Sequence, residues 1–167
     1  MHIYLVGFMG VGKTTIGKKL ANQLKLRFID TDKLIAQQTG KSIPKLFEQK
    51  GEEVFRLIES QALRSIDETP SVIATGGGLP CYYDNMSYMN VHGVTVFLRA
   101  DKWFIHNRLT QAKAPRPLIK SLNSEELLAF IEEKLTSRQG FYSQSKVQVD
   151  VPLKSFETLV NTVVGLL

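Results

Sequence analysis

Short apolar runs alternate with segments of helical periodicity along the whole chain. Five short runs of mostly apolar residues predict strands, at 3–6, 27–29, 71–74, 95–98 and 147–149. Between them, apolar residues recur at helical spacing and predict helices over about 13–25, 34–39, 43–66, 102–111, 124–142 and 156–166. This alternation predicts a mostly parallel sheet covered by helices on both faces, which is a three-layer α/β/α fold.

The first three predicted strands are each followed by residues that suit ligand binding. In sheets of this kind, ligands bind beyond the carboxyl ends of the strands. A glycine-rich run at 7–15 follows the first strand, Asp-Thr-Asp at 30–32 follows the second, and Thr-Gly-Gly-Gly at 75–78 follows the third. We therefore expect the functional site at this edge of the sheet.

The run at 7–15 matches the phosphate-binding pattern G-x-x-x-x-G-K-[ST]. Glycines let the backbone approach phosphate oxygens, and free N–H groups at the start of the next helix favour negative charge. The lysine can reach the β and γ phosphates, and the following hydroxyl can bind Mg²⁺. A chance glycine turn is the alternative, but a strand before the run and a helix after it favour ATP binding. The expected ATP-binding residues here are Gly10, Val11, Gly12, Lys13, Thr14 and Thr15.

Two carboxylates, Asp30 and Asp32, follow the second strand. In an extended segment this spacing places both on one side of the chain, where one could face a metal and the other an acceptor hydroxyl. Capping of the helix predicted at 34–39 is the alternative. The third strand is not followed by the aspartate that often binds the metal beside a P-loop, which favours Asp30 for that role.

Three consecutive glycines at 76–78 are entropically costly, which indicates that something approaches the backbone closely there. A bound ligand is the functional interpretation. A tight turn into Leu79 and Pro80 is the alternative.

Two arginines lie in apolar surroundings, where a charged side chain needs an anion. Arg138 shares a helical stripe with apolar residues, and Arg56 has apolar neighbours on both sides within 54–58. A substrate carboxylate would satisfy either guanidinium through paired hydrogen bonds. An internal acidic side chain is the alternative for each, and for Arg56 the candidates are Glu52, Glu53 and Glu59.

The segment at about 112–124 has neither helical nor strand periodicity, and prolines on both sides of Arg116 disfavour a helix. We expect a lid that carries Arg116 over the phosphates, with an ordinary surface loop as the alternative. Arg108, on the preceding predicted helix, is expected on the nucleotide side.

Length and composition are those of one globular domain over 1–167, with 43% hydrophobic residues. No apolar run approaches the ~20 residues that span a bilayer, and the apolar start lacks the basic residues of a signal peptide. The single cysteine, Cys81, fits the reducing cytoplasm. The net charge of +5 comes from scattered basic residues, which favours anionic substrates over nucleic acid. We expect a cytoplasmic monomer without nucleic-acid or membrane partners.

Six motifs occur in order and together resemble the shikimate kinase family over essentially the whole chain. They are G-F-M-G-V-G-K-T at 7–14, D-T-D at 30–32, G-E-E-V-F-R at 51–56, T-G-G-G at 75–78, R-P-L at 116–118 and R-Q-G-F-Y at 138–142. The resemblance implies a nucleoside-monophosphate-kinase-like fold with a five-stranded parallel sheet, a substrate-binding helical segment at about 31–62 and a lid at 112–124. It implies ATP-dependent, Mg²⁺-requiring phosphorylation of the shikimate 3-hydroxyl, a step of chorismate and aromatic amino acid biosynthesis.

The resemblance also implies roles for single residues on the substrate side. Asp32 would contact the substrate hydroxyls and is the candidate base. Arg56 and Arg138 would hold the shikimate carboxylate. Gly77 and Gly78 would contact the substrate through the backbone.

On the nucleotide side, the resemblance implies that Thr14 binds Mg²⁺ with Asp30 near the metal. Lys13 and Arg116 would offset the charge of the transferring phosphoryl group, which makes Lys13, Asp32 and Arg116 the expected catalytic set. Arg108 would lie near adenine.

Two other functions remain open on the residues alone. Gluconate also carries a carboxylate and hydroxyls, so a gluconate-type kinase would also use two arginines. A catalytically silent nucleotide-binding module would need a lost catalytic residue, and none is missing. The guanine-specific N-K-x-D motif is absent from the sequence, which argues against a GTPase switch.

Overall fold

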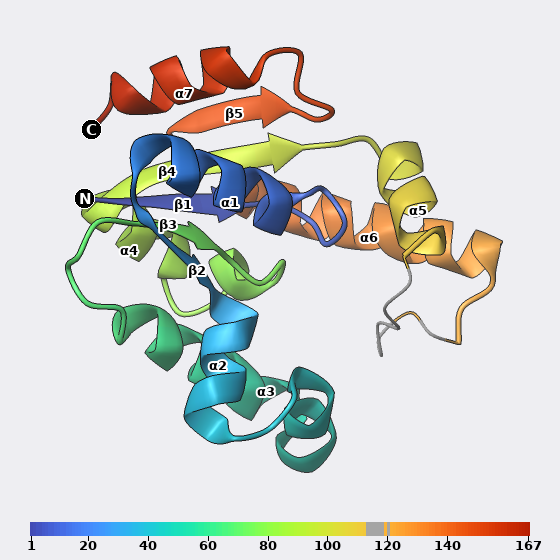
Figure 1. The fold of residues 1–167 in the computed structure, drawn as a ribbon. Coiled ribbons are helices and arrows are strands. Elements are labelled where there is room, and N and C mark those ends of the chain that lie inside the picture. Colours follow the sequence, from blue (N-terminus) through green and yellow to red (C-terminus); the bar gives the residue numbers. More distant parts are fainter. Residues whose placement is uncertain (113–118, 120) are drawn as a thin grey trace.

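A five-stranded parallel sheet forms the centre of the computed structural model, which describes residues 1–112, 119 and 121–167 (Figure 1). Neighbouring strands pair in the order β2-β3-β1-β4-β5, and every pair is parallel. The strands are β1 (His2–Val6), β2 (Arg27–Asp30), β3 (Ser71–Ala74), β4 (Gly93–Arg99) and β5 (Val147–Asp150). All five coincide with predicted strands, so the expected α/β architecture is confirmed.

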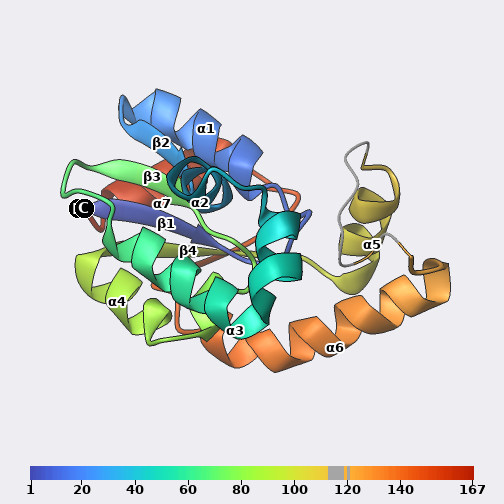
Figure 2. The same ribbon diagram turned by 90° about the horizontal axis from the view of Figure 1, so that it is seen from below.

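Helices cover both faces of the sheet, which completes the expected three layers. Figure 2 shows α1 on one side of the strands and α3, α4 and α6 on the other. The helices are α1 (Lys13–Leu24), α2 (Thr31–Thr39), α3 (Ile43–Arg64), α4 (Asn85–His92), α5 (Lys102–Thr110), α6 (Ser124–Tyr142) and α7 (Phe156–Val164), with a 3-10 turn η1 (Leu79–Cys81). Within the described ranges, none of them is long and apolar enough to cross a lipid bilayer.

The alternating side chains of β1 divide the core between the two faces. Ile3 and Leu5 are buried in one cluster with Leu20 of α1 and Leu159 of α7. The intervening Tyr4 and Val6 face the other side, in a cluster with side chains of α3, α4 and α6. The central strand is therefore buried on both faces, as its apolar sequence predicts.

A smaller third cluster joins α2 to α3 and lies beyond the main sheet (Figure 1). Its buried members are Ile35, Leu46, Phe55 and Ala62. Within α3, Gly51 has φ 76° and ψ 172°, so the helix is broken into two parts at this residue. The break folds the first part back and brings Phe47 against Phe55, with ring centroids 4.3 Å apart.

Several predicted boundaries differ from the structure. The sequence did not predict α4, whose short segment has little amphipathic pattern and whose first-turn residue Asn85 is buried. Helix α2 begins at Thr31 rather than 34, because Asp30 caps it. Helix α6, by contrast, begins at Ser124 as predicted, and Asn123 caps it in a reciprocal arrangement with Glu126.

Candidate active site

The loop between β1 and α1 leaves the start of α1 open to receive an anion. Gly12 is the residue before the helix, with φ 100°, and no side chain caps the N–H groups that follow it. Gly7 is also constrained, because a Cβ on it would lie 2.7 Å from the carbonyl oxygen of Leu98. The side chain of Val11 is buried in the core, so only its backbone can face a ligand. The loop thus has the geometry of a phosphate cradle.

Lys13 is held inside this loop. Its Nζ donates to the carbonyl oxygens of Gly7 at 2.6 Å and Phe8 at 2.8 Å. The ammonium group is therefore placed at the centre of the cradle by the loop's own backbone, where it can interact with phosphate oxygens.

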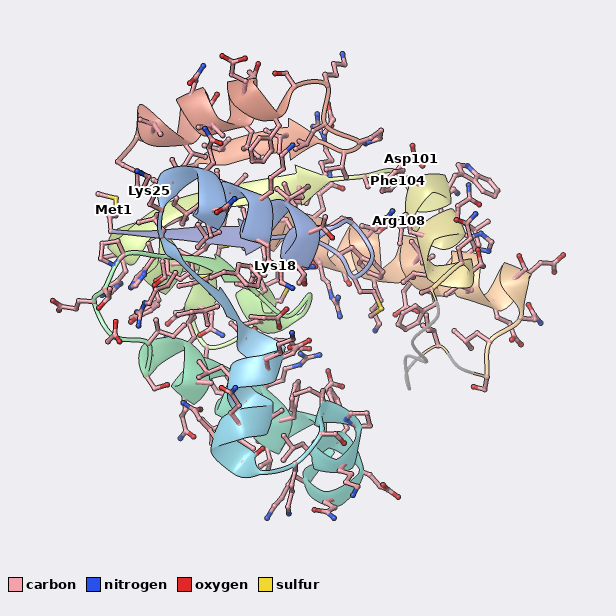
Figure 3. All side chains as sticks on the ribbon, viewed as in Figure 1. Met1, Lys18, Lys25, Asp101, Phe104 and Arg108 are labelled. Carbon is pink, nitrogen blue, oxygen red and sulfur yellow. The ribbon has the colours of Figure 1, made fainter. Side chains whose placement is uncertain are left out.

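A cavity of about 470 Å³ lies over the cradle, a size typical of small-molecule sites. Arg108 on α5 stands at its wall, close to the loop (Figure 3), and the Cβ of Arg108 is 3.7 Å from where a Cβ on Gly10 would be. The lining residues come from three strand ends and α5: Met9, Gly10, Gly12, Lys13, Thr14, Thr15, Asp30, Asp32, Ala74, Thr75, Gly76, Gly77, Arg108, Gln111 and Ala112. The residues expected to bind nucleotide and metal thus meet here, apart from Val11 and Arg116.

Asp30 links the second strand to the cradle. One of its oxygens, Oδ2, accepts a hydrogen bond of 3.1 Å from the Thr14 hydroxyl. The other, Oδ1, accepts from the backbone N–H groups of Asp32 and Lys33 and caps α2. Asp30 therefore both caps a helix and lies at the cavity, so the two interpretations of this residue are compatible.

The expectation that 30–32 is extended is wrong for Asp32. Because α2 begins at Thr31, Asp32 belongs to its first turn. Its carboxylate nevertheless reaches the same cavity as Asp30, since both residues line it.

The oxygens of Thr14 and Asp30 suit Mg²⁺, which prefers hard oxygen ligands. The described residues contain no cluster of three or more acidic, histidine or cysteine side chains able to hold a metal by themselves. A magnesium ion here would need further oxygens from phosphate and water, as is usual in phosphoryl transfer. The donor set thus fits a nucleotide-bound Mg²⁺.

The glycines at 76–78 are required by charged side chains that pack directly on their backbone. A Cβ on Gly76 would lie 2.7 Å from Oε1 of Glu59 and 3.0 Å from Oδ1 of Asp32. A Cβ on Gly78 would lie 2.5 Å from Nη1 of Arg56. The backbone also turns here, since the Leu79 N–H donates to the Gly76 carbonyl at 3.2 Å. The loop is therefore a turn, and side chains of the protein itself approach its backbone closely.

Arg56 is 6% exposed and pairs with two glutamates. Its Nη1 donates to Glu59 at 2.6 Å, while Nη2 and Nε donate to Oε1 of Glu52 at 3.0 and 3.3 Å. Burial lowers the pKa of Arg56, but the Glu59 carboxylate and the two ion-paired hydrogen bonds outweigh this and raise it overall. The internal partner expected as an alternative is therefore present, and it consists of two of the three candidates.

Glu59 is a part of the site that the sequence analysis considered only as an ion-pair partner. It is 2% exposed, and burial raises its pKa to about 7, against the opposing effect of Arg56. The carboxylate of Asp32 also raises the pKa, and Arg138 lowers it. Its position one helical turn after Arg56 was the signal available in the sequence.

Arg138 reaches the same region from α6. It packs over the ring of Phe8 with 5.5 Å between the guanidinium carbon and the centroid, and its Nη1 is 3.4 Å from where a Cβ on Gly77 would be. The Tyr142 hydroxyl donates to the Gly77 carbonyl and fixes α6 to the glycine loop. In the part of the chain that the structure describes, no carboxylate forms an ion pair with Arg138.

Some predicted features lie elsewhere or outside the described residues. Arg116 and most of the expected lid at 112–124 lie outside the described residues. Cys81 is half-buried beside the second core cluster, and burial raises the pKa of its thiol to about 11, which fits a packing role. Trp103 is exposed.

Comparison with known proteins gives a consistent result. A family model described as shikimate kinase matches residues 9–166. A shikimate kinase of Parabacteroides distasonis is 43% identical over 150 residues, which cover 89% of this chain and 87% of the relative.

Solved structures agree with these sequence matches. The crystal structure of shikimate kinase from Bacteroides thetaiotaomicron superimposes with a TM-score of 0.90 at 38% identity, over 99% of this chain and 97% of that one. Shikimate kinase from Acinetobacter baumannii, in complex with shikimate, gives a TM-score of 0.83 at 32% identity, over 99% and 91%.

Proposed function

We propose that this chain, which belongs to the shikimate kinase family, phosphorylates the 3-hydroxyl of shikimate with ATP. This reaction is a step in the biosynthesis of chorismate and aromatic amino acids. The proposal rests on one observation, which is that the expected site residues meet at the edge of the sheet formed by the carboxyl ends of the strands. There the phosphate cradle, two aspartates and two arginines surround one glycine loop.

The cradle side would bind ATP. The N–H groups from Gly10 to Thr15 would hold the phosphates, and Lys13 would exchange its bonds to the loop carbonyls for bonds to phosphate oxygens. Thr14 and Asp30 would hold Mg²⁺, which supplies positive charge to the phosphates during transfer. Arg108 would contact the nucleotide from α5.

The other side would bind shikimate through its carboxylate. A guanidinium has five N–H groups, and three of those of Arg56 donate to glutamates, so two remain for an incoming carboxylate. Arg56 can therefore keep its internal ion pairs and still bind substrate. Arg138 would supply the second cation, and Gly77 and Gly78 would contact the substrate through backbone groups.

Asp32 would orient the acceptor hydroxyl and accept its proton as the phosphoryl group is transferred. Its carboxylate lines the nucleotide cavity and lies beside the Gly76 backbone, where the two substrates would meet. Arg116, on a lid at 112–124, would close over the phosphates and limit hydrolysis by water. Within this scheme 31–62 is the substrate-binding segment.

The enzyme would act as a monomer, since all the proposed residues come from a single chain. It would act in the cytoplasm, whose reducing conditions suit its single cysteine. Sedimentation at micromolar concentration tests the monomeric state: one species at the mass of a single chain, 18.8 kDa, supports it, and a stable dimer contradicts it.

Release of ADP from Mg-ATP in the presence of different acceptors tests the proposed function. We expect ADP release that depends on shikimate, with gluconate and nucleoside monophosphates no better than the reaction without acceptor. A response to gluconate would point to the other small-metabolite kinase, and ATP binding without turnover on any acceptor would point to a silent module.

A further inference from the structure

Tyr82 covers one side of the buried arginine but belongs to none of the groups assigned so far. It directly follows η1, four residues after the last glycine of the loop. The guanidinium carbon of Arg56 lies 4.7 Å from the centroid of the Tyr82 ring. The same guanidinium lies 5.5 Å from the Phe55 ring and 5.7 Å from the Phe47 ring. Arg56 is therefore enclosed by aromatic rings from two elements, α3 and the turn after the glycine loop.

The hydroxyl of Tyr82 makes a second connection to the same arginine. It donates to Oε1 of Glu52 at 3.3 Å, and this is the oxygen that accepts from both Nε and Nη2 of Arg56. The Glu52 side chain is 59% exposed, whereas that of Glu59 is 3% exposed. Of the two carboxylates that hold Arg56, only the exposed Glu52 also accepts a hydrogen bond from another side chain among the described residues.

We propose that Tyr82 is a positioning residue for carboxylate recognition, because its ring and its hydroxyl fix the plane of the Arg56 guanidinium. The ring keeps water from one face of the cation, and the hydroxyl fixes the glutamate that binds its Nε–Nη2 edge. One N–H group on Nη1 and one on Nη2 remain, and their positions are then fixed. This inference rests on the proposed function, in which those groups bind the shikimate carboxylate.

Steady-state kinetics of Tyr82→Phe and Tyr82→Ala test the two contributions separately. Removal of the hydroxyl should raise the KM for shikimate about 3- to 10-fold, since one hydrogen bond to a charged group is lost. Removal of the ring as well, in Tyr82→Ala, should raise the KM for shikimate further. In both variants kcat and the KM for ATP should stay within about twofold of the wild type, because chemistry and nucleotide binding are untouched. Tyr83→Phe is the matched control, since the Tyr83 hydroxyl has no hydrogen-bond partner among the described residues and its side chain is exposed.

The carboxamide analogue of shikimate distinguishes a role of Tyr82 in carboxylate recognition from a purely structural role. With this neutral acceptor the KM ratio between Tyr82→Phe and wild type should fall to about one, because the aligned cation gains little from an amide. An equal ratio on both acceptors overturns the inference, as does a Tyr82→Phe enzyme with the wild-type KM for shikimate.

Arg56→Ala distinguishes failure of the inference from failure of the proposed function. If Arg56→Ala leaves shikimate binding unchanged, the assignment of Arg56 to the substrate is wrong, and the inference falls with it. If Arg56→Ala weakens binding but Tyr82→Phe does not, only the inference is wrong. If the Tyr82→Phe effect disappears in the Arg56→Ala background, Tyr82 acts through Arg56, as proposed.

Discussion

Arg56 and Arg138 differ in how the protein holds them, and this difference predicts how each responds to mutation. Arg56 is held by Glu52 and Glu59, so its loss would leave a buried carboxylate without its cation. Arg138 lies beside the Phe8 ring, the Tyr142 hydroxyl and the glycine loop, and it forms no ion pair with a carboxylate in the described structure. Arg138 is therefore the cleaner position at which to test substrate binding.

For Arg138→Ala we expect the KM for shikimate to rise about 10- to 100-fold, which corresponds to loss of hydrogen bonds to a charged group. The KM for Mg-ATP should change less than about twofold, because the nucleotide cavity does not include this residue. Gln139→Ala, at the exposed neighbouring position on α6, is the control. An unchanged KM for shikimate in Arg138→Ala would show that this arginine does not bind the substrate.

Glu59 should make stability depend on pH. Its pKa is raised from the ordinary 4.5 to about 7, first because of burial and despite Arg56, with Asp32 and Arg138 as the other charges that act on it. Between these two values the folded protein keeps a proton that the unfolded chain releases. The free energy of unfolding should therefore fall as pH rises through this window, with a limiting slope of about 1.4 kcal/mol per pH unit.

Urea denaturation of wild type and Glu59→Gln at a series of pH values measures this effect. The difference in unfolding free energy between the two should change between pH 4.5 and 7 and level off on either side. Glu53→Gln, at an exposed position on the same helix, should keep the wild-type dependence. Identical pH profiles for wild type and Glu59→Gln would contradict the raised pKa.

Among the helices and strands, the broken helix α3 has the most direct effect on the proposed substrate site. Gly51 adopts a backbone conformation that is essentially restricted to glycine, although a Cβ there would meet no atom within 4 Å. The break lets Phe47 pack on Phe55 beside Arg56. The conformation of one exposed residue thus determines part of the wall around a buried arginine.

We predict that Gly51→Ala destabilises the protein by about 1–3 kcal/mol and raises the KM for shikimate, because alanine strains this backbone conformation. Thermal unfolding and acceptor kinetics measure the two effects. Gly140→Ala, in the regular part of α6 and with no atom within 4 Å of its Cβ, should be neutral or stabilising. If Gly51→Ala matches Gly140→Ala in both measurements, the break is not needed for the site.

The sequence predicted the elements whose signal is local and missed those that depend on distant contacts. The five strands and the loop at 7–15 follow from apolar runs and from one motif, so they were predictable. Helix α4 was not, because its short segment lacks amphipathic pattern and is stabilised by burial of Asn85, Met86 and Met89. The Glu59 pair with Arg56 was one of three possible pairs, and only the fold selects it together with Glu52.

The contact of Tyr82 with Arg56 had no sequence signal at all. The two residues are far apart in the chain, and they meet only because the glycine loop passes over α3. The site was therefore predictable at the level of its motifs, while the enclosure of its arginine was not.

At the scale of the whole molecule, the strand order explains why motifs far apart in sequence form one site. With β1 and β2 on either side of β3, the residues that follow all three strands meet at one edge. Helix α6 adds Arg138 from the far end of the chain, fixed by Tyr142 to Gly77. Nucleotide and acceptor would thus bind to neighbouring but separate sets of residues.

This separation predicts additive stabilisation by the two ligands. A ligand at 100 times its Kd stabilises the folded state by about 2.7 kcal/mol, so ADP with Mg²⁺ should raise Tm and shikimate should raise it again. In Lys13→Met the increase caused by ADP should be largely lost while that caused by shikimate remains. Differential scanning fluorimetry measures both, and loss of both increases together would show that the sites are not separate.

The most direct test of the central claim is the rate at which shikimate 3-phosphate forms from Mg-ATP and shikimate, followed by ³¹P NMR for wild type and Asp32→Asn. We expect a single phosphate ester at the 3-hydroxyl from the wild type. For Asp32→Asn we expect a rate lower by at least about 100-fold, with shikimate still bound, because general-base catalysis contributes on this scale. Phosphorylation at another position, or an Asp32→Asn enzyme with the wild-type rate, would contradict this claim.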